Sequence, residues 1–397
     1  MLEEAPEVYD RMEKWVEGAD WIVWQLCGTY LRNICSAGYK GQYQADCLSD
    51  SNGPYPSREY LAALNPLMEN FVEQKLEHEI GHLGQKCGTL TAQAAQWTGL
   101  PEGIAVAVGN VDAHVTNAAA NAVTDGEMVA IMGTSTCHIM VSDVLANVPG
   151  MCGVVDGGVI SGSLGYEAGQ SGVGDIFGWF AKNYLPEEYT QGAAAAGQDI
   201  HTYLCDMFAQ QAPGAHGLVC LDWQSGNRST LVDHQLSGLI VGMTLQTKPE
   251  EIYRALIEST AFGAKKIITT FNECGVQIKK FIAAGGLIKN RVLMQIYSDV
   301  LNMPIYTVKS EQGCALGAAI HAAVAAGAYP DVSSASAVMG GQDDHVYHPI
   351  KQNIDTYACL FRHYEQLYEM FGKGNQIMHS LREIRDTAVA ASERRQS

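Results

Sequence analysis

The sequence predicts an α/β protein with two to three domains, and three observations support this prediction. Its 397 residues exceed what one simple core usually takes. Glycines are abundant, 41 in all, and cluster at the ends of apolar runs, as they do where strands turn into helices. Residues 281–308 have the pattern of a strand, a helix and a second parallel strand.

The N-terminal third is expected to begin with helices and to continue with short strands. Aromatic residues recur at helical spacing up to a stop at Gly28, and a second helical region follows. Short β-branched runs that end in glycine predict buried strands, and the Gly133-Thr134-Ser135-Thr136 turn predicts a hairpin. The expected helices cover residues 8–31 and 57–83, and the expected strands cover residues 104–108, 128–132, 137–141 and 154–160.

The C-terminal half has clearer helix signals. Thr247 as N-cap, Pro249 and Glu250 start a helix that Gly275 closes. A strand at 281–284, the pair Gly285-Gly286, a helix and a strand at 305–308 form a β-α-β unit. Residues 315–326 form a helix of small residues that can pack closely on a neighbour. A last amphipathic helix runs through residues 360–371, and the polar tail after residue 384 is expected to fray.

Charge and composition exclude several classes of function. With 43 acidic and 25 basic side chains, the net charge of −18 repels nucleic acid and anionic membranes. The richest apolar stretch, residues 314–328, is too short for a membrane span and contains His321. The acidic N-terminus lacks the features of a signal peptide. The 11 cysteines include no C-x-x-C pair, which indicates reduced thiols and a cytoplasmic protein.

The most conspicuous motif is HEIGH at residues 78–82, which fits two zinc-binding histidines one helical turn apart with a glutamate base. A third ligand is required. Glu102 lies between a proline and a glycine, whereas a zincin takes this glutamate from a helix. We interpret the motif as a solvated helix face and keep a zinc peptidase as a remote alternative.

A second constellation starts at Asp112, which follows the predicted strand at 104–108 in the sequence GNVDAH. The carboxyl ends of strands are where α/β proteins collect ligands, and an aspartate there can accept a proton from a substrate hydroxyl. Taken alone, Asp112 is better explained as a turn or cap residue, because aspartate is common after strands for structural reasons.

Two glycine-containing loops follow in the chain. The 133–136 turn offers backbone N–H groups and three hydroxyls, which can hold phosphate oxygens, although a plain hairpin explains it equally well. The pair Gly285-Gly286 ends a strand and opens a helix, and so permits close approach of a nucleotide. It is not a G-x-G-x-x-G fingerprint, and a lone pair of glycines is weak support. Three such loops in this order are more informative together.

In this order, an aspartate after a strand, a G-T-S hairpin and a G-G-x-x-x-N loop resemble the FGGY family of carbohydrate kinases. The stretch GLIVGMTLQTKPEEIYRALIE resembles the C-terminal signature of that family. Several further segments are most similar to the members of the family that phosphorylate L-ribulose in L-arabinose breakdown. These segments are ADWIVWQLCG, SAGYKG, VAVGNVDAHV, IMGTSTCH, VPGMCGVVDGG, YEAGQSGVGDIFGWF and GNRS. The likeness runs from about residue 19 to residue 382.

The resemblance implies an actin-like, RNase H-like two-domain fold, ATP with Mg²⁺ as cofactors, and transfer of the γ-phosphoryl group to L-ribulose. Asp112 is then the general base, and Lys40 and Glu167 contact the sugar. Six further residues face the nucleotide: Thr134 and Ser135 at the transferring phosphate, and Gly174, Gly285, Gly286 and Asn290 around the rest. No metal ligand is assigned. The implied division is a sugar-binding part at 1–124, a nucleotide-binding domain at 125–350, and a C-terminal helix with its tail at 351–397.

The sequence departs from the family pattern at its N-terminus, because no D-x-G-T phosphate loop precedes the first helix. We therefore expect an incomplete first domain, with strand edges and an apolar face open to another chain. Two alternatives follow: a non-catalytic remnant that binds sugar or nucleotide weakly, and a kinase for another ketopentose. The expected partner is a small ketopentose, with no nucleic acid or membrane, and with a homodimer as one arrangement.

Overall fold

The computed structural model describes residues 1–44 and 54–393. Its strands are β1 (Arg32–Asn33), β2 (Ile80–Gly81), β3 (Lys86–Thr89), β4 (Ala105–Ala107), β5 (Glu127–Met132), β6 (Thr136–Ser142), β7 (Gly153–Asp156), β8 (Leu164–Gln170), β9 (Val219–Leu221), β10 (Leu239–Val241), β11 (Lys280–Ala284) and β12 (Ile305–Thr307).

The α-helices are α1 (Pro6–Arg11), α2 (Gly18–Cys27), α3 (Ile34–Gly41), α4 (Arg58–Leu64), α5 (Ala92–Thr98), α6 (Asp112–Ala119), α7 (Gly174–Asn183), α8 (Glu187–Ala196), α9 (Ile200–Phe208), α10 (Pro249–Glu273), α11 (Arg291–Leu301), α12 (Gly313–Ala325), α13 (Val332–Met339), α14 (Lys351–Gly372) and α15 (Ile377–Glu393). Three single turns, η1 (Pro66–Met68), η2 (Val72–Leu76) and η3 (Gly286–Lys289), complete the elements.

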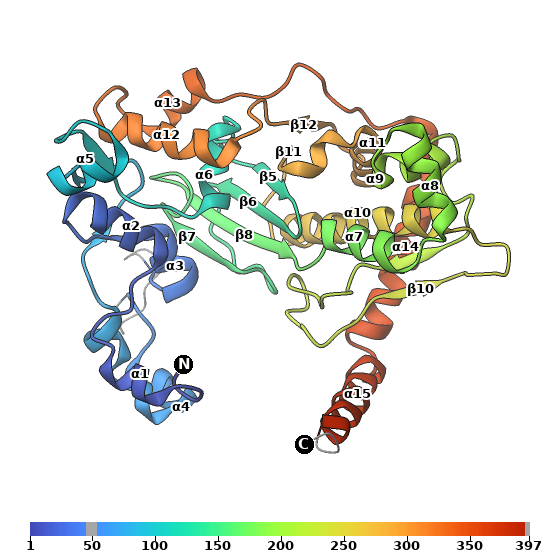
Figure 1. Cartoon of the computed structure of the whole chain (residues 1–397), viewed down its shortest axis with the longest axis horizontal. Coiled ribbons are helices and arrows are strands. Elements are labelled where there is room, and N and C mark those ends of the chain that lie inside the picture. Colours follow the sequence, from blue (N-terminus) through green and yellow to red (C-terminus); the bar gives the residue numbers. More distant parts are fainter. Residues whose placement is uncertain (45–53, 394–397) are drawn as a thin grey trace.

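A mixed six-stranded sheet in the order β12-β11-β5-β6-β8-β7 forms the centre of the molecule (Figure 1). Strands β12, β11 and β5 are parallel, so their carboxyl ends meet at one edge. Strand β6 returns antiparallel to β5, and β8 and β7 continue the antiparallel pairing. The predicted hairpin, β5 and β6, and the predicted β-α-β unit, which contains β11 and β12, thus lie in one sheet. They are joined where β5 pairs with β11.

Helices cover both faces of this sheet. One face carries Ile139 and Val141, which pack against Ala118 of α6 and Ile320 of α12. The opposite face carries residues such as Tyr166, which join the large core built around α10 and α14. In Figure 1, α6, α12 and α13 lie above the sheet and α10 lies to its right. The alternation of side chains along each strand therefore divides the core into two layers.

The small-residue helix packs as predicted. A Cβ placed on Gly317 of α12 would lie 2.0 Å from the backbone oxygen of Val115 in α6, so only glycine permits this approach. The same holds for α3, where a Cβ on Gly38 would lie 2.4 Å from the side chain of Val155 in β7. Glycine thus brings both helices close to their neighbours.

Residues 1–111 form a separate group of helices with two short ladders, at the left in Figure 1. Strand β1 pairs parallel with β2, and β3 pairs antiparallel with β4. Helix α2 ends at Gly28, whose φ of 73° is left-handed, as the predicted stop requires. Strand β4 is confirmed but only half-buried, because it pairs with β3 alone.

Three predictions about helices need correction. The second helical region ends at Leu76, because Ile80 and Gly81 pair with β1 and leave the helix. The N-cap of α10 is Lys248, whose N–H donates to the side chain of Glu251, so the start is one residue later than predicted. The tail stays helical to Glu393 in α15, since its alanine-rich sequence has high helix propensity. No helix in the described ranges is long and apolar enough to cross a membrane.

Candidate functional site

The hairpin turn at residues 133–136 lies against the start of α7. The backbone N–H of Val173 donates to the Thr134 oxygen at 2.9 Å, and that of Gly174 donates to the Gly133 oxygen at 3.0 Å. A Cβ on Gly174 would lie 2.6 Å from the same Gly133 oxygen. Thr134 is exposed and Ser135 is half-buried. The structure therefore brings together three residues that the resemblance assigns to the nucleotide.

The Gly285-Gly286 pair borders the same turn. It follows β11, which is parallel to β5, so both loops lie at the carboxyl edge of the sheet. Gly285 has a φ of 91°, and a Cβ there would lie 2.4 Å from the Met132 oxygen just before the hairpin. Beyond β11 and β12 this edge opens into a cavity of about 550 Å³, lined by both glycines together with Lys289 and Lys309. Such an edge is where open α/β sheets bind ligands.

Asn290 has a structural role in this arrangement. Its side-chain oxygen accepts from the Leu293 N–H at 3.0 Å and caps α11, and its amide nitrogen donates to Cys205 Sγ of α9 at 3.1 Å. Its assignment to the nucleotide stays a prediction. Its amide is engaged within the protein, so Asn290 fixes the start of α11 beside the two glycines.

Asp112 begins α6 directly after the β4 segment. Its carboxylate is exposed, and one oxygen accepts from the N–H of Ala113 at 2.9 Å. The Thr116 hydroxyl donates to the Asp112 backbone oxygen at 3.2 Å and anchors this turn. A carboxylate at a helix N-terminus is stabilised by the helix dipole. Asp112 is thus held by its backbone while its second oxygen stays open to a ligand.

Two residues further along α6, His114 reaches Glu167 of β8. The His114 Nε2 atom lies 3.3 Å from Glu167 Oε2, and Arg228 donates from Nη2 to Glu167 Oε1. The ring of Tyr39, from α3, lies 4.6 Å from the His114 ring. We call His114, Glu167 and Arg228 the site cluster. It connects the α3, α6 and β8 elements that carry the predicted sugar residues.

The electrostatics of the site cluster favour its charged forms. Burial raises the pKa of Glu167, but His114 and Arg228 outweigh it and hold that pKa below the usual value. Burial lowers the pKa of His114, yet the neighbouring Cys35 and Glu167 raise it to about 9. At neutral pH the cluster therefore holds one negative and two positive charges.

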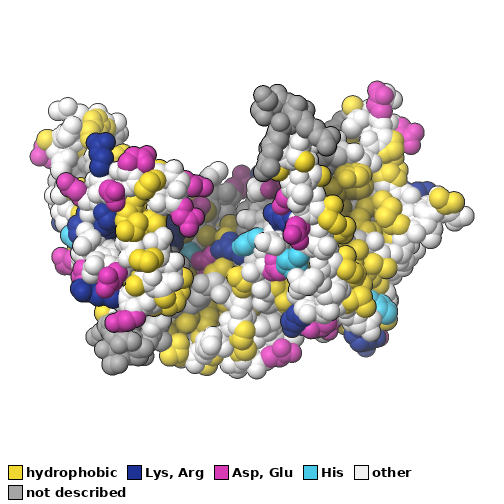
Figure 2. All heavy atoms as spheres, turned by 90° about the horizontal axis from the view of Figure 1, so that it is seen from below, with side chains coloured by type: hydrophobic (Ala, Val, Ile, Leu, Met, Phe, Trp, Pro, Cys, Tyr) yellow, Lys and Arg dark blue, Asp and Glu magenta, His cyan; other side chains and the backbone are white. Residues whose placement is uncertain are grey.

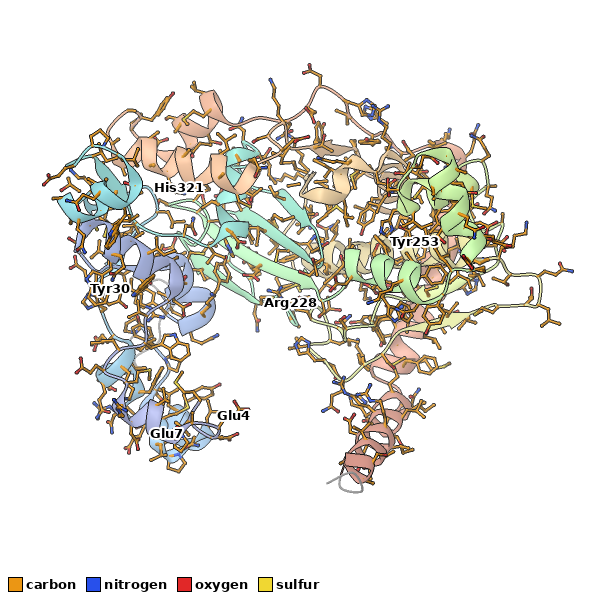
Figure 3. The ribbon with its side chains drawn as sticks, in the orientation of Figure 1. Glu4, Glu7, Tyr30, Arg228, Tyr253 and His321 are labelled. Carbon is orange, nitrogen blue, oxygen red and sulfur yellow. The ribbon has the colours of Figure 1, made fainter. Side chains whose placement is uncertain are left out.

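Lys40 is the one predicted sugar residue whose charged group points elsewhere. Its side chain is exposed, and Nζ pairs with Glu17 at 3.3 Å. The adjacent Tyr39 contacts the site cluster, so Lys40 lies at its border. Figure 2 shows a hollow between the N-terminal helices and the rest of the molecule, with basic, acidic and histidine side chains on its floor. In Figure 3, Arg228 lies at the lower side of the sheet, between the two parts.

The zinc motif is not a helix, which corrects our interpretation of it as a helix face. His78 stacks on Tyr30 with ring centroids 4.1 Å apart, and its Nε2 atom lies 2.9 Å from the Tyr30 oxygen. Residues 80–81 form β2, so His82 is not one helical turn away. Among the described residues there is no group of three His, Cys, Asp or Glu side chains that could hold a metal ion.

Sequence reasoning missed His114, Tyr39 and Arg228 as site residues. His114 stands in the GNVDAH segment and Arg228 in GNRS, so both belong to motifs that carry the resemblance. No spacing rule joins them, because Arg228 lies 61 residues after Glu167 in the chain. Only the folded sheet brings them together.

Comparisons with known proteins agree with this geometry. Residues 128–326 match the C-terminal domain of the FGGY family of carbohydrate kinases. A ribulokinase from Mycolicibacterium smegmatis is 56% identical over 388 residues, which cover 98% of this chain and 68% of that protein. A ribulokinase from Bacillus licheniformis is 46% identical, covering 99% of this chain and 71% of that protein.

Solved structures give the same fold. A gluconate kinase from Lactobacillus acidophilus has a TM-score of 0.77 at 20% identity, covering 94% of this chain and 71% of that one. A xylulose kinase from the same organism has a TM-score of 0.76 at 19% identity, covering 94% of this chain and 72% of that one. The molecule is thus an α/β protein with the actin-like fold of sugar kinases. The chain belongs to the FGGY family of carbohydrate kinases.

Proposed function

We propose that this chain catalyses the ATP-dependent phosphorylation of L-ribulose on its C5 hydroxyl, which yields L-ribulose 5-phosphate and ADP. The ribulokinases that are 46% to 56% identical over nearly the whole chain support this substrate. The observation that carries the chemistry is the exposed carboxylate of Asp112, two residues from a histidine that contacts Glu167. A free carboxylate beside a polar sugar site suits proton acceptance.

In this proposal Asp112 accepts the C5 hydroxyl proton as the hydroxyl oxygen attacks the γ-phosphorus of ATP. The bond from that phosphorus to the bridging oxygen of ADP breaks, and the proton stays on Asp112. Glu167 and Lys40 hold the sugar by hydrogen bonds to its other hydroxyls. Phosphoryl transfer depends mostly on positioning and charge neutralisation, so these contacts matter as much as the base.

The nucleotide side uses the two glycine loops at the carboxyl edge of the sheet. In this proposal Thr134 and Ser135 face the transferring phosphate, and the contact of their turn with the start of α7 supports this role. Gly174, Gly285, Gly286 and Asn290 border the rest of the nucleotide. The lack of Cβ atoms at these glycines lets backbone N–H groups approach phosphate oxygens.

Mg²⁺ suits this site as an ion that arrives with the nucleotide. Mg²⁺ keeps several waters and binds through one or two carboxylates together with substrate phosphates. The exposed Asp175, whose backbone N–H donates to the Thr134 oxygen at 3.2 Å, offers one carboxylate beside the hairpin turn. Bound Mg²⁺ would neutralise phosphate charge.

We retain the division into a sugar-binding part at 1–124, a nucleotide-binding domain at 125–350 and a C-terminal helix with its tail at 351–397. Asp112 lies in the first part, although its helix α6 packs on α12 of the second. The general base therefore stands at the border between the two parts. Movement of one part against the other would change the distance from the base to the phosphate loops.

The test is a coupled ATP assay with L-ribulose, D-ribulose, D-xylulose and L-xylulose. Asp112→Asn is expected to lower kcat by roughly 10²–10⁴-fold, because it removes proton acceptance but keeps the shape. Asp143→Asn, an exposed aspartate at the far end of β6 from the hairpin turn, is the matched control and should keep wild-type turnover.

Comparable turnover in Asp112→Asn and wild type would remove Asp112 as the base. Turnover of D-xylulose but not of L-ribulose would move the substrate to another ketopentose. Calorimetric binding of ATP or sugar with no turnover of any sugar would favour the weak-binding alternative.

A further inference from the structure

The carboxylate of Glu167 is held on both of its oxygens by cations from two different parts of the chain. Arg228 donates to Oε1, and His114 lies 3.3 Å from Oε2. Charge-assisted contacts of this kind are stronger and more directional than neutral hydrogen bonds. Contacts on both oxygens restrict rotation of the Glu167 carboxylate and so limit the directions in which its remaining lone pairs point.

The two cations are themselves fixed by packing. His114 is buried, and the Tyr39 ring lies 4.6 Å from the His114 ring. Arg228 crosses β8 at Gly169, where a Cβ would lie only 2.9 Å from the arginine side chain. Gly169 therefore leaves the space that lets Arg228 reach Glu167.

Arg228 is only partly covered by these contacts. Its side chain is 32% exposed, whereas that of Glu167 is 10% exposed. Arg228 also lies 3.8 Å from the sulfur of Cys137, three residues beyond Thr134 in the hairpin turn. The guanidinium group of Arg228 is thus partly open to solvent while it contacts both Glu167 and Cys137.

We propose that His114 and Arg228 form a clamp that positions Glu167 for the sugar and thereby sets the discrimination between ketopentose epimers. This inference rests on the proposed function, because it takes Glu167 as a sugar contact. A fixed acceptor bonds well to a hydroxyl of one configuration and poorly to its epimer. A freely rotating acceptor would adjust to both. His114 and Arg228 are then positioning residues, and Arg228 also offers donors to the sugar.

The experiment compares wild type, Arg228→Met, Arg228→Lys, His114→Leu and His114→Gln with L-ribulose, its C3 epimer L-xylulose, and ATP as varied substrates. Arg228→Met and His114→Leu are expected to raise KM for L-ribulose by about 10- to 100-fold and to leave KM for ATP within two-fold. The preference for L-ribulose over its C3 epimer L-xylulose should fall at least several-fold. His114→Gln keeps a donor near the position of Nε2, and Arg228→Lys keeps the positive charge. These two variants should restore part of the sugar KM and part of the epimer preference.

The control is His216→Gln, which alters a histidine–glutamate contact of 3.0 Å in the core. It should lower stability and leave both the sugar KM and the epimer preference unchanged. Calorimetry with L-ribulose on the same variants measures binding without turnover.

Unchanged sugar KM, binding and epimer preference in Arg228→Met and His114→Leu would overturn the clamp while the proposed function stands. Equal rises in the KM for sugar and for ATP would also overturn it, since they indicate general loss of structure. A wild-type chain that neither binds nor turns over L-ribulose would instead overturn the proposed function, and the clamp with it.

Discussion

Two glutamates in this molecule lie between a histidine and an arginine, and they differ in what surrounds them. Glu167, in the site cluster, contacts His114 and Arg228. Glu258 of α10 accepts from Arg254 Nε at 2.9 Å and lies 3.0 Å from His216 Nε2. We call Glu258, His216 and Arg254 the core cluster.

The core cluster is closed. Tyr357 donates a third hydrogen bond to Glu258, and the side chains of Glu258 and Arg254 are only 1% and 4% exposed. The Leu218 N–H donates to His216 Nδ1, so that nitrogen carries no proton and His216 is neutral. One negative and one positive charge balance each other inside the core.

The site cluster is open and carries one more positive charge. His114 has a pKa of about 9 and is protonated at neutral pH, and Arg228 is one-third exposed. The same three residue types therefore serve two purposes. A closed, neutral set joins core elements, whereas an open set with excess positive charge suits a polar or anionic ligand. The predictions below test this distinction, from the largest effect to the smallest.

Glu258→Gln should have the largest effect on stability. It leaves Arg254 as a buried, uncompensated charge, and breaking a buried ion pair in this way costs about 3–5 kcal/mol. Urea unfolding followed by circular dichroism measures the change. The KM for L-ribulose of the folded protein should stay within two-fold. A loss below 1 kcal/mol would contradict the structural role of the core cluster.

Substitution of Arg254 and of Arg228 should lower the free energy of unfolding by different amounts in the same urea assay. Arg254→Met should lower the free energy of unfolding by about 2–4 kcal/mol, because Glu258 is then buried without a cation partner and keeps only its hydrogen bonds. Arg228→Met should lower it by less than about 1 kcal/mol, because Arg228 is partly solvated. Equal losses in both variants would remove the distinction between an open and a closed cluster.

The pH dependence of stability should report the protonated state of His114. Its pKa is about 9 in the folded chain and about 6.5 when unfolded, so the folded state holds the proton more tightly. The resulting stabilisation is complete below pH 6.5 and is lost as pH rises through 9, by about 1–3 kcal/mol. Urea unfolding at pH 6, 7.5 and 9.5 measures it, and His114→Gln should flatten the change. If the free energy of unfolding of His114→Gln changed as steeply with pH as that of the wild type, His114 would not be the group responsible.

Lys40→Met should have the smallest effect on stability, below about 0.5 kcal/mol, because its pair with Glu17 is exposed. If Lys40 contacts the sugar, the same variant raises KM for L-ribulose several-fold. Lys373→Met, which removes another exposed pair with Glu369, is the control and should change neither stability nor KM. Unchanged KM in both variants would remove Lys40 from the sugar site.

Much of the fold followed from local signals, because those signals are strong where neighbours in sequence are also neighbours in space. The hairpin at 133–136 and the helix between Pro249 and Glu273 were predicted from turn and cap residues. The helix prediction for the HEIGH segment was wrong for the opposite reason. Its helical spacing was overridden when Ile80 and Gly81 paired with β1, far away in the chain.

The sequence by itself determined the α/β class, the glycine loops and the family, because these depend on local patterns and on motifs within single segments. Only the tertiary structure decided what the charged residues do. The sheet brings Arg228 to Glu167 across 61 residues and α6 brings His114 to the same carboxylate, and these contacts then favour the charged forms against the effect of burial. Spacing in a sequence contains no such distance, and the exposure that separates Arg228 from Arg254 exists only once the chain is packed.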